Sequence, residues 1–247
     1  NARHSIFRAS PLASDERSMH FDGVNDYIEV GSGSSDFAFG TGDYTVEGWF
    51  SFSNLTGVQV LCDLRPFNSI DNNRTLFATT GSGLYMYLAG SNTTLAASGS
   101  LTTHRWHHIA FVRSSGTLKT YIDGVLKSSI TSNTNHSTDG TPHLGSTPRF
   151  NTYYNVNHEA FLQGYVYDFR IINGTAAYTG EFTPPSGKLT ATGGSYPSTT
   201  NVNTSITSSH TKLLIQPEEG GSIDDETSNH SLTVTGAVIP SSGPYEQ

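Results

Sequence analysis

The carboxylates decide first whether this chain can cleave a glycan, because such an enzyme needs two of them on one face, one as acid and one as base or nucleophile. In a β-strand, side chains share a face only at spacings of two or four residues. The acids of the strand-like segments do not pair in this way, and they are Glu29, Glu47, Asp63, Glu159 and Asp168. The sequence therefore favours a protein that is not an enzyme.

Three histidines lie close together in the sequence and suggest a metal site, namely His104, His107 and His108. In a strand, however, His107 and His108 point to opposite faces and cannot bind the same ion. We therefore interpret these histidines as structural.

Calcium is the better metal hypothesis, since Ca²⁺ takes oxygen ligands from carboxylates, amides and carbonyl groups. Asp22, Asn25 and Asp26 form a compact oxygen-rich turn that could supply such ligands. The alternative is that Asp22 and Asn25 only accept hydrogen bonds within their own turn. No other cofactor is expected.

Aromatic and amide side chains provide the best candidates for a binding surface. Sugar sites combine apolar contacts with a few polar groups, and tyrosines serve equally well as anchors of protein interfaces. Two tyrosines are adjacent in an Asn-rich loop, and two more share one face of a strand. The candidates for glycan binding or an interface are Tyr153, Tyr154, Asn151, Asn155, Tyr85 and Tyr87.

The elements that must position these residues are β-strands. Apolar side chains alternate along 44–52 and 106–113, whereas helical periodicity is hard to find. In 118–126, Asp123-Gly124 separates two strand-like runs and predicts a hairpin. Pro184-Pro185 ends regular structure.

One aromatic run is expected to line the core of a β-sandwich. With strict alternation along 161–171, one face carries Phe161, Tyr165, Tyr167, Phe169 and Ile171. We also assign Trp49 and Trp106 to the core.

Length and charge exclude several classes of protein. The 247 residues suffice to bury a core without disulfides, and charged residues make up only 14% of them. The net charge of −8 comes with no evident basic patch, which argues against a nucleic-acid partner. No apolar run is long enough for membrane insertion. Cys62, the one cysteine, reads as a small buried apolar residue.

Composition divides the chain into four parts. Residues 1–18 are expected to form an arm, 19–190 an all-β domain, 191–211 a linker, and 212–247 a strand-bearing C-terminal extension. The acidic stretch at 218–226 within this extension is expected to be solvated. The predicted fold is all-β, a two-sheet antiparallel sandwich.

Four segments together carry a family resemblance: FDGVNDYIEV at 21–30, DYTVEGWF at 43–50, WHHIAFVRSSGTLKTYIDGVL at 106–126 and GYVYDFRIINGTAAYTGEFTPP at 164–185. In this order they resemble the laminin-G-like domain, a jelly-roll sandwich of the concanavalin-A-like lectin/glucanase type. The last segment resembles the versions found in bacteriophage virion proteins, both tail-fibre-like and capsid-decorating ones.

The resemblance implies a non-enzymatic virion surface module that contacts neighbouring subunits, forms a homo-oligomer and has a glycan-binding role. Its location would be the virion surface or the extracellular space. The alternative is a calcium-assisted carbohydrate-binding adhesion module without an assembly role, and a glycan-active hydrolase is third. The C-terminal extension resembles the opening strands of a further repeat. It would complete a sheet either in its own chain or in a neighbour.

Overall fold

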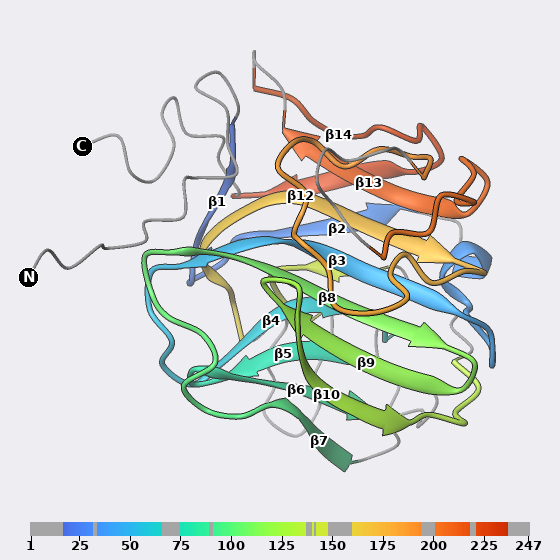
Figure 1. The fold of residues 1–247 in the computed structure, drawn as a ribbon. Coiled ribbons are helices and arrows are strands. Elements are labelled where there is room, and N and C mark those ends of the chain that lie inside the picture. The colour runs from blue at the N-terminus through green and yellow to red at the C-terminus, as the bar shows by residue number, and fades with distance from the viewer. Residues whose placement is uncertain are drawn as a thin grey trace, which may run out of the picture.

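The computed structural model describes residues 17–31, 34–65, 75–88, 91–136, 140, 142–147, 160–193, 201–217 and 221–236, which form two stacked antiparallel sheets (Figure 1). The all-β sandwich expected from the sequence is confirmed. The strands are β1 (Met19–Asp22), β2 (Tyr27–Gly31), β3 (Tyr44–Phe52), β4 (Val58–Asp63), β5 (Leu76–Thr80), β6 (Gly83–Leu88), β7 (Ser91–Ala96), β8 (Trp106–Ser114), β9 (Thr117–Ile122), β10 (Val125–Thr131), β11 (His143–Leu144), β12 (Gln163–Asn173), β13 (Thr211–Pro217), β14 (Ile223–Asp225) and β15 (Ser231–Thr235). One short 3-10 helix, η1, spans Ser34–Phe37.

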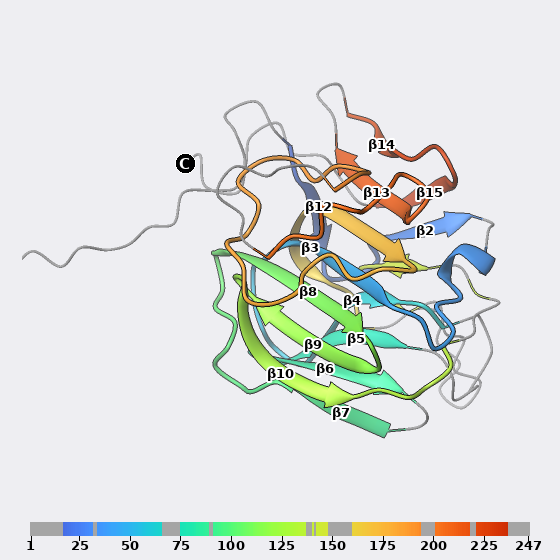
Figure 2. The same cartoon turned by 45° about the vertical axis from the view of Figure 1, so that its right-hand side comes forward.

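The eight-stranded sheet has the order β10-β9-β8-β3-β12-β13-β14, and β1 pairs with β12 as well. The seven-stranded sheet has the order β15-β2-β11-β4-β5-β6-β7. Figures 1 and 2 look onto the eight-stranded sheet, with β4 to β6 behind it. Within the described residues, no helix is long and apolar enough to cross a membrane.

The main core lies between the two sheets and follows the alternation of the strands. In β3, Val46, Phe50 and Phe52 point into this core, whereas Glu47 and Trp49 lie on the outer face. Burial of such side chains stabilises the fold by roughly 1.5–3 kcal/mol each. Trp49 and Trp106 are buried too, but in a separate cluster on the outer face of the eight-stranded sheet rather than in the main core.

The prediction that one face of residues 161–171 carries a continuous aromatic run into the core is wrong. The pairing of β12 with β3 shifts register between Tyr167 and Arg170, and Asp168 between them has a φ of 58°. This β-bulge inserts one residue and so reverses the alternation. As a result Tyr165 and Tyr167 pack on the outer face, while Phe169 and Ile171 face the main core.

The hairpin predicted at Asp123-Gly124 is confirmed. Val125 pairs with Ile122, so Asp123 and Gly124 alone make the turn. Both have positive φ, 54° and 76°, as a type I′ turn requires.

The C-terminal strands pair within the same chain. β13 pairs with β12 over Phe169–Ile172, beyond the stretch of β12 that β1 occupies, and β15 pairs with β2. Leu213 and Ile215 of β13 are fully buried in the main core. These strands therefore complete both sheets of this chain.

Part of the segment predicted as a linker packs on the domain. Ile206 is buried beside Tyr178 and Phe182, and Val202 pairs with Tyr178 in an isolated bridge. Residues 201–210 thus cover the outer face of the eight-stranded sheet together with residues 174–193.

Asp225 differs from the solvated acid that the sequence suggested. It is buried, and its carboxylate accepts hydrogen bonds from the backbone N–H groups of Leu214, Thr227 and His230 and from the Thr227 hydroxyl. These hydrogen bonds hold the turn after β14. They also make burial of the carboxylate possible, since a buried charge is stable only when its oxygens accept hydrogen bonds.

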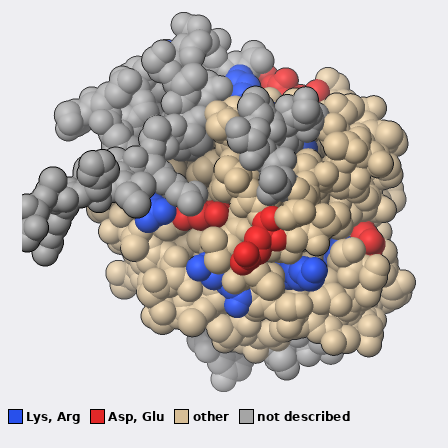
Figure 3. Space-filling model, in the orientation of Figure 1, with Lys and Arg blue, Asp and Glu red and all other residues tan. Residues whose placement is uncertain are grey.

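The face of the molecule in Figure 3 shows acidic and basic side chains interspersed on a largely uncharged surface. In its described part there is no continuous basic patch of the kind that binds phosphates.

Gly124 is expected to be the most sensitive turn glycine. A Cβ there would overlap the backbone carbonyl of Phe182, whose N–H donates to Gly124 O. Gly124→Ala should lower the free energy of unfolding by about 2–4 kcal/mol, measured by urea denaturation. Gly99→Ala is the control, since Gly99 also has positive φ but open space around it. It should cost only about 1 kcal/mol, and equal losses would contradict the steric explanation.

Candidate functional site

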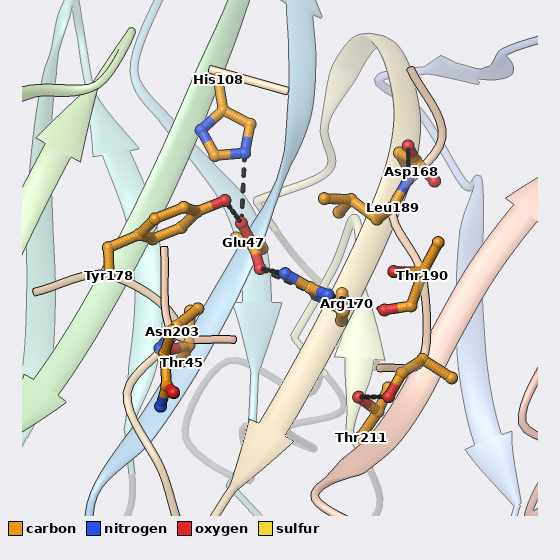
Figure 4. A network of polar contacts seen from close by, with 12 residues as sticks. Thr45, Glu47, His108, Asp168, Arg170, Tyr178, Leu189, Thr190, Asn203 and Thr211 are labelled. Atoms are coloured by element: carbon orange, nitrogen blue, oxygen red, sulfur yellow. Dashed lines mark hydrogen bonds and ion pairs between the residues drawn. The ribbon is translucent and has the colours of Figure 1, made fainter. Parts of the chain in front are cut away.

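A buried polar network on the outer face of the eight-stranded sheet is the first candidate (Figure 4). At its centre, Glu47 of β3 accepts hydrogen bonds from Arg170 Nε of β12 at 2.8 Å and from the Tyr178 hydroxyl at 2.6 Å. His108 Nε2 of β8 lies 3.3 Å from the same carboxylate. The three strands are neighbours in the sheet, so Glu47, His108 and Arg170 meet although they are far apart in the sequence. Tyr178 joins them from the segment that follows β12.

Burial by itself would raise the pKa of the Glu47 carboxyl, but the Arg170 guanidinium, His108 and the Tyr178 hydroxyl outweigh it and hold the pKa at about 2. The side chains of Glu47 and His108 have no exposure and that of Arg170 only 1%. A group sealed in this way cannot reach a substrate, so the network is not an active site.

The network instead attaches to the eight-stranded sheet the irregular segments that cover its outer face, residues 174–193 and 201–210, which we call the cover. Arg170 Nη1 donates to the Thr190 carbonyl at 2.7 Å, and the Ala177 N–H donates to Thr45 Oγ1 at 2.9 Å. Asp168, on the bulge, accepts from the Leu189 N–H at 2.6 Å and from the Gln216 amide of β13. Each contact joins the irregular cover or β13 to β3 or β12.

The histidines lie as the alternation predicts, with His107 and His108 on opposite faces. His107 lies 3.2 Å from the Asp123 carboxylate and 3.1 Å from Thr102 Oγ1. His108 packs edge-on against Trp49 and Phe182. Within the described part of the chain, no three His, Cys, Asp or Glu side chains gather as a metal-binding group.

Loss of the Glu47 charge should destabilise the protein in a pH-dependent way. Glu47→Gln leaves Arg170 buried without a counter-charge, which should cost about 3–5 kcal/mol at pH 7. Because the pKa of Glu47 is about 2 in the folded state against 4.5 ordinarily, its contribution is complete above pH 4.5 and is lost as the pH falls toward 2. The difference in unfolding free energy between wild type and variant should therefore shrink over that window.

Glu181→Gln is the matched control, because Glu181 is an exposed carboxylate that accepts only the Leu126 N–H in the described structure. It should change stability by less than about 0.5 kcal/mol. A wild-type advantage over Glu47→Gln that stays constant from pH 7 to pH 2.5 would show that the pair does not act through charge.

The second candidate lies on the outer face of the seven-stranded sheet, where one row of side chains crosses five strands. Pairing registers place Glu29 of β2 opposite His143 of β11, His143 opposite Asp63 of β4, Asp63 opposite Leu76 of β5, and Leu76 opposite Tyr87 of β6. Their chain neighbours, such as Ile28, Cys62 and Met86, are in the main core. Alternation therefore puts the whole row on the outer face.

We call this surface the tyrosine face, defined by Glu29, His143, Asp63, Arg65, Leu76, Tyr85 and Tyr87. Tyr85 and Tyr87 are half-buried and pack on a small apolar floor made of Val60, Leu76 and Ala78. Asn92 and Thr94 of β7 pair with Tyr87 and Tyr85 and are exposed. Aromatic rings thus lie beside amide and hydroxyl groups, a combination that small-ligand sites commonly use.

A buried ion pair lies at the centre of the tyrosine face. Arg65 donates from Nε to Asp63 Oδ1 at 2.9 Å and from Nη2 to Oδ2 at 2.7 Å, and Nη2 also donates to Thr147 Oγ1 at 3.1 Å. The Arg65 guanidinium carbon lies 5.2 Å from the centre of the Tyr87 ring. These hydrogen bonds therefore fix the orientation of the Arg65 guanidinium beside the Tyr87 ring.

Of the predicted binding residues, Tyr85 and Tyr87 are together on the tyrosine face. Asn151, Tyr153, Tyr154 and Asn155 lie outside the described residues. Both described flanks of that loop contact the tyrosine face: Thr147 accepts from Arg65, and Ala160 packs against the cluster of Tyr85 and Tyr87. Thr147 and Ala160, the described residues on either side of this stretch, therefore both lie at the tyrosine face.

The candidate calcium turn is used as a turn. Asp22 Oδ1 accepts the N–H groups of Val24 at 2.7 Å and Asn25 at 3.2 Å, and Asp26 Oδ2 accepts the Asp22 N–H at 2.8 Å. Gly236, after β15, lies so close to Asp26 that a Cβ would overlap its carboxylate. Burial raises the pKa of Asp26, whereas the Val24 N–H outweighs burial and lowers that of Asp22.

Sequence reasoning missed three polar members of the tyrosine face, Glu29, Arg65 and His143. They come from segments far apart in the chain, and only the pairing of β2, β11 and β4 brings them together. The one local signal was Asp63-Leu64-Arg65, an acid and a base two residues apart at a strand end.

The fold and its segments match a known family. The model of the concanavalin A-like lectin/glucanases superfamily (laminin-G type 3) matches residues 22–183, and the chain belongs to this family. No curated protein sequence matches the chain.

Two solved structures show the same fold at low sequence identity. A candidate carbohydrate-binding protein from Bacteroides ovatus ATCC 8483 is 14% identical with a TM-score of 0.64, over 92% of this chain and 60% of its own length. The heptameric SAP-like pentraxin from Limulus polyphemus is 12% identical with a TM-score of 0.54, over 94% of this chain and 98% of its own. The chain thus spans less than two thirds of the length of the Bacteroides protein.

Proposed function

We propose that this protein is a non-enzymatic carbohydrate-binding module and that the tyrosine face binds the glycan. The observation that carries the proposal is the placement of Tyr85 and Tyr87 beside the Arg65–Asp63 pair and the exposed Asn92. Membership of the concanavalin A-like lectin/glucanases superfamily and the fold shared with the Bacteroides protein support carbohydrate binding.

The dimensions of the face suit an oligosaccharide better than a single sugar. From Glu29 to Tyr87 the row crosses four strand spacings, about 19 Å at 4.7–4.9 Å each. The partly exposed side chains of the row are those at its two ends, Glu29 and Tyr87, whereas His143, Asp63 and Leu76 between them are buried. An oligosaccharide of this length would therefore contact the two ends of the row.

Hydrolysis is the alternative, because Glu29 and Asp63 lie on the same face two strands apart, about 10 Å by strand spacing. The Asp63 side chain, however, has no exposure and both of its oxygens accept from Arg65. A carboxylate held in this way cannot donate a proton to a glycosidic oxygen. We therefore expect a bound oligosaccharide to be recovered intact after long incubation, as mass spectrometry would show.

Removal of the two rings should abolish binding. On a glycan array with the protein displayed multivalently, Tyr87→Ala and Tyr85→Ala should each weaken binding to the best ligand by about tenfold or more, because each ring supplies about 1–3 kcal/mol of contact. Tyr87→Phe should keep most of the binding if ring contact dominates.

Tyr165→Ala is the control, since Tyr165 is also a half-buried tyrosine but lies on the outer face of the other sheet. It should bind as wild type does. If Tyr85→Ala and Tyr87→Ala, shown to be folded by circular dichroism, bind normally, the glycan site is elsewhere.

Glycan binding is expected to be independent of calcium. The carboxylates of Asp22 and Asp26 accept three backbone N–H groups of their own turn, so the turn is complete without a metal. Binding measured in EDTA and in millimolar Ca²⁺ should agree within about twofold. A tenfold loss in EDTA would support the calcium-assisted alternative instead, and Asp22→Asn and Asp26→Asn would then show whether this turn holds the ion.

A virion surface location is a separate proposal, and it rests on the resemblance of residues 164–185 to phage versions of the domain. In that setting the module would decorate a capsid or tail as a homo-oligomer. Antibodies against the chain should label intact particles in electron micrographs. Labelling of the producing cells alone would contradict a virion role.

A further inference from the structure

We propose that the tyrosine face selects uncharged glycans and rejects those that carry a carboxylate, such as sialic or uronic acids. This inference rests on the proposed function and specifies its ligand class. It comes from the charges on the face and from the way its arginine is held.

An arginine recognises a ligand carboxylate through two parallel N–H donors. On this face those donors are already used: Nε and Nη2 of Arg65 point at the two oxygens of Asp63, at 2.9 and 2.7 Å. The Arg65 side chain is only 11% exposed and that of Asp63 not at all. The Asp63 carboxylate therefore occupies the two N–H donors that a sugar carboxylate would otherwise accept from.

The remaining charge on the described face is negative. Glu29, whose side chain is 43% exposed, lies in the same row, with its Oε2 3.9 Å from His143 Nε2. Arg65 and Asp63 cancel each other, so Glu29 leaves a partly exposed negative charge at its end of the row. A ligand carboxylate placed along the row would be repelled by Glu29 and would lose its hydration without gaining a cation.

The test compares pairs of glycans that differ only in charge. The probes are oligosaccharides with and without one terminal sialic acid, and glucose oligomers against glucuronic acid oligomers of equal length. At pH 7 and low salt, the charged member of each pair should bind about tenfold more weakly. Raising the salt concentration should narrow this gap, because it screens the exposed Glu29 charge.

Two variants connect the selectivity to the named charges. Asp63→Asn frees the Arg65 guanidinium and should narrow or reverse the preference, while Glu29→Gln, a change at a partly exposed side chain, should narrow it without risk to the fold. Glu181→Gln removes the same charge from an exposed position that the row does not include. It should leave the preference as in wild type.

The outcomes separate this inference from the proposed function. Equal or tighter binding of the acidic probes by wild type would overturn the selectivity and leave glycan binding standing. An unchanged preference in Glu29→Gln together with an unchanged preference in folded Asp63→Asn would overturn it as well. Failure of every probe, neutral and acidic, to bind would contradict the proposed function itself.

Discussion

The bulge at Asp168 is the constraint on which most of the structure depends. With strict alternation along β12, Arg170 would point into the apolar core, at the cost of burying an unpaired charge. The extra residue instead turns Phe169 and Ile171 inward and Arg170 outward, where Glu47 of the neighbouring strand receives it. The Asp168 side chain then binds Leu189 and Gln216, so the same residue also ties the cover and β13 to β12.

The protein uses two buried Arg–carboxylate pairs for different purposes. The pair of Arg170 and Glu47 is buried beneath residues 174–193, and Arg170 also donates to the Thr190 carbonyl of that segment. The pair of Arg65 and Asp63 lies on the outer face of the other sheet, beside Tyr87, and Arg65 also donates to the Thr147 hydroxyl. This pair therefore connects the end of β4 to the segment after β11.

The C-terminal strands cover the edges of β12 and β2 and the core side chains beside them. A sandwich without β13 and β15 would expose the edges of β12 and β2 and the core side chains beside them, and open edges invite association. β13 places Leu213 and Ile215 in the core, and β15 covers β2. The family model ends at residue 183, so strands beyond the matched region complete both of its sheets.

Alternating polarity and turn dipeptides determined much of this fold in advance. The all-β sandwich, the hairpin at Asp123-Gly124 and the opposed His107 and His108 could all be predicted, because period-two patterning and turn chemistry are local. The bulge was not readable, because a one-residue insertion in a ladder appears only when the partner strand is known. The same holds for the tyrosine face. The sequence showed that Tyr85 and Tyr87 share a side, but Glu29, His143, Asp63 and Arg65 join them only through the order and register of β2, β11, β4, β5 and β6. Pairing between strands distant in the chain is a property of the assembled sheet, so tertiary structure alone decided what lies beside the tyrosines.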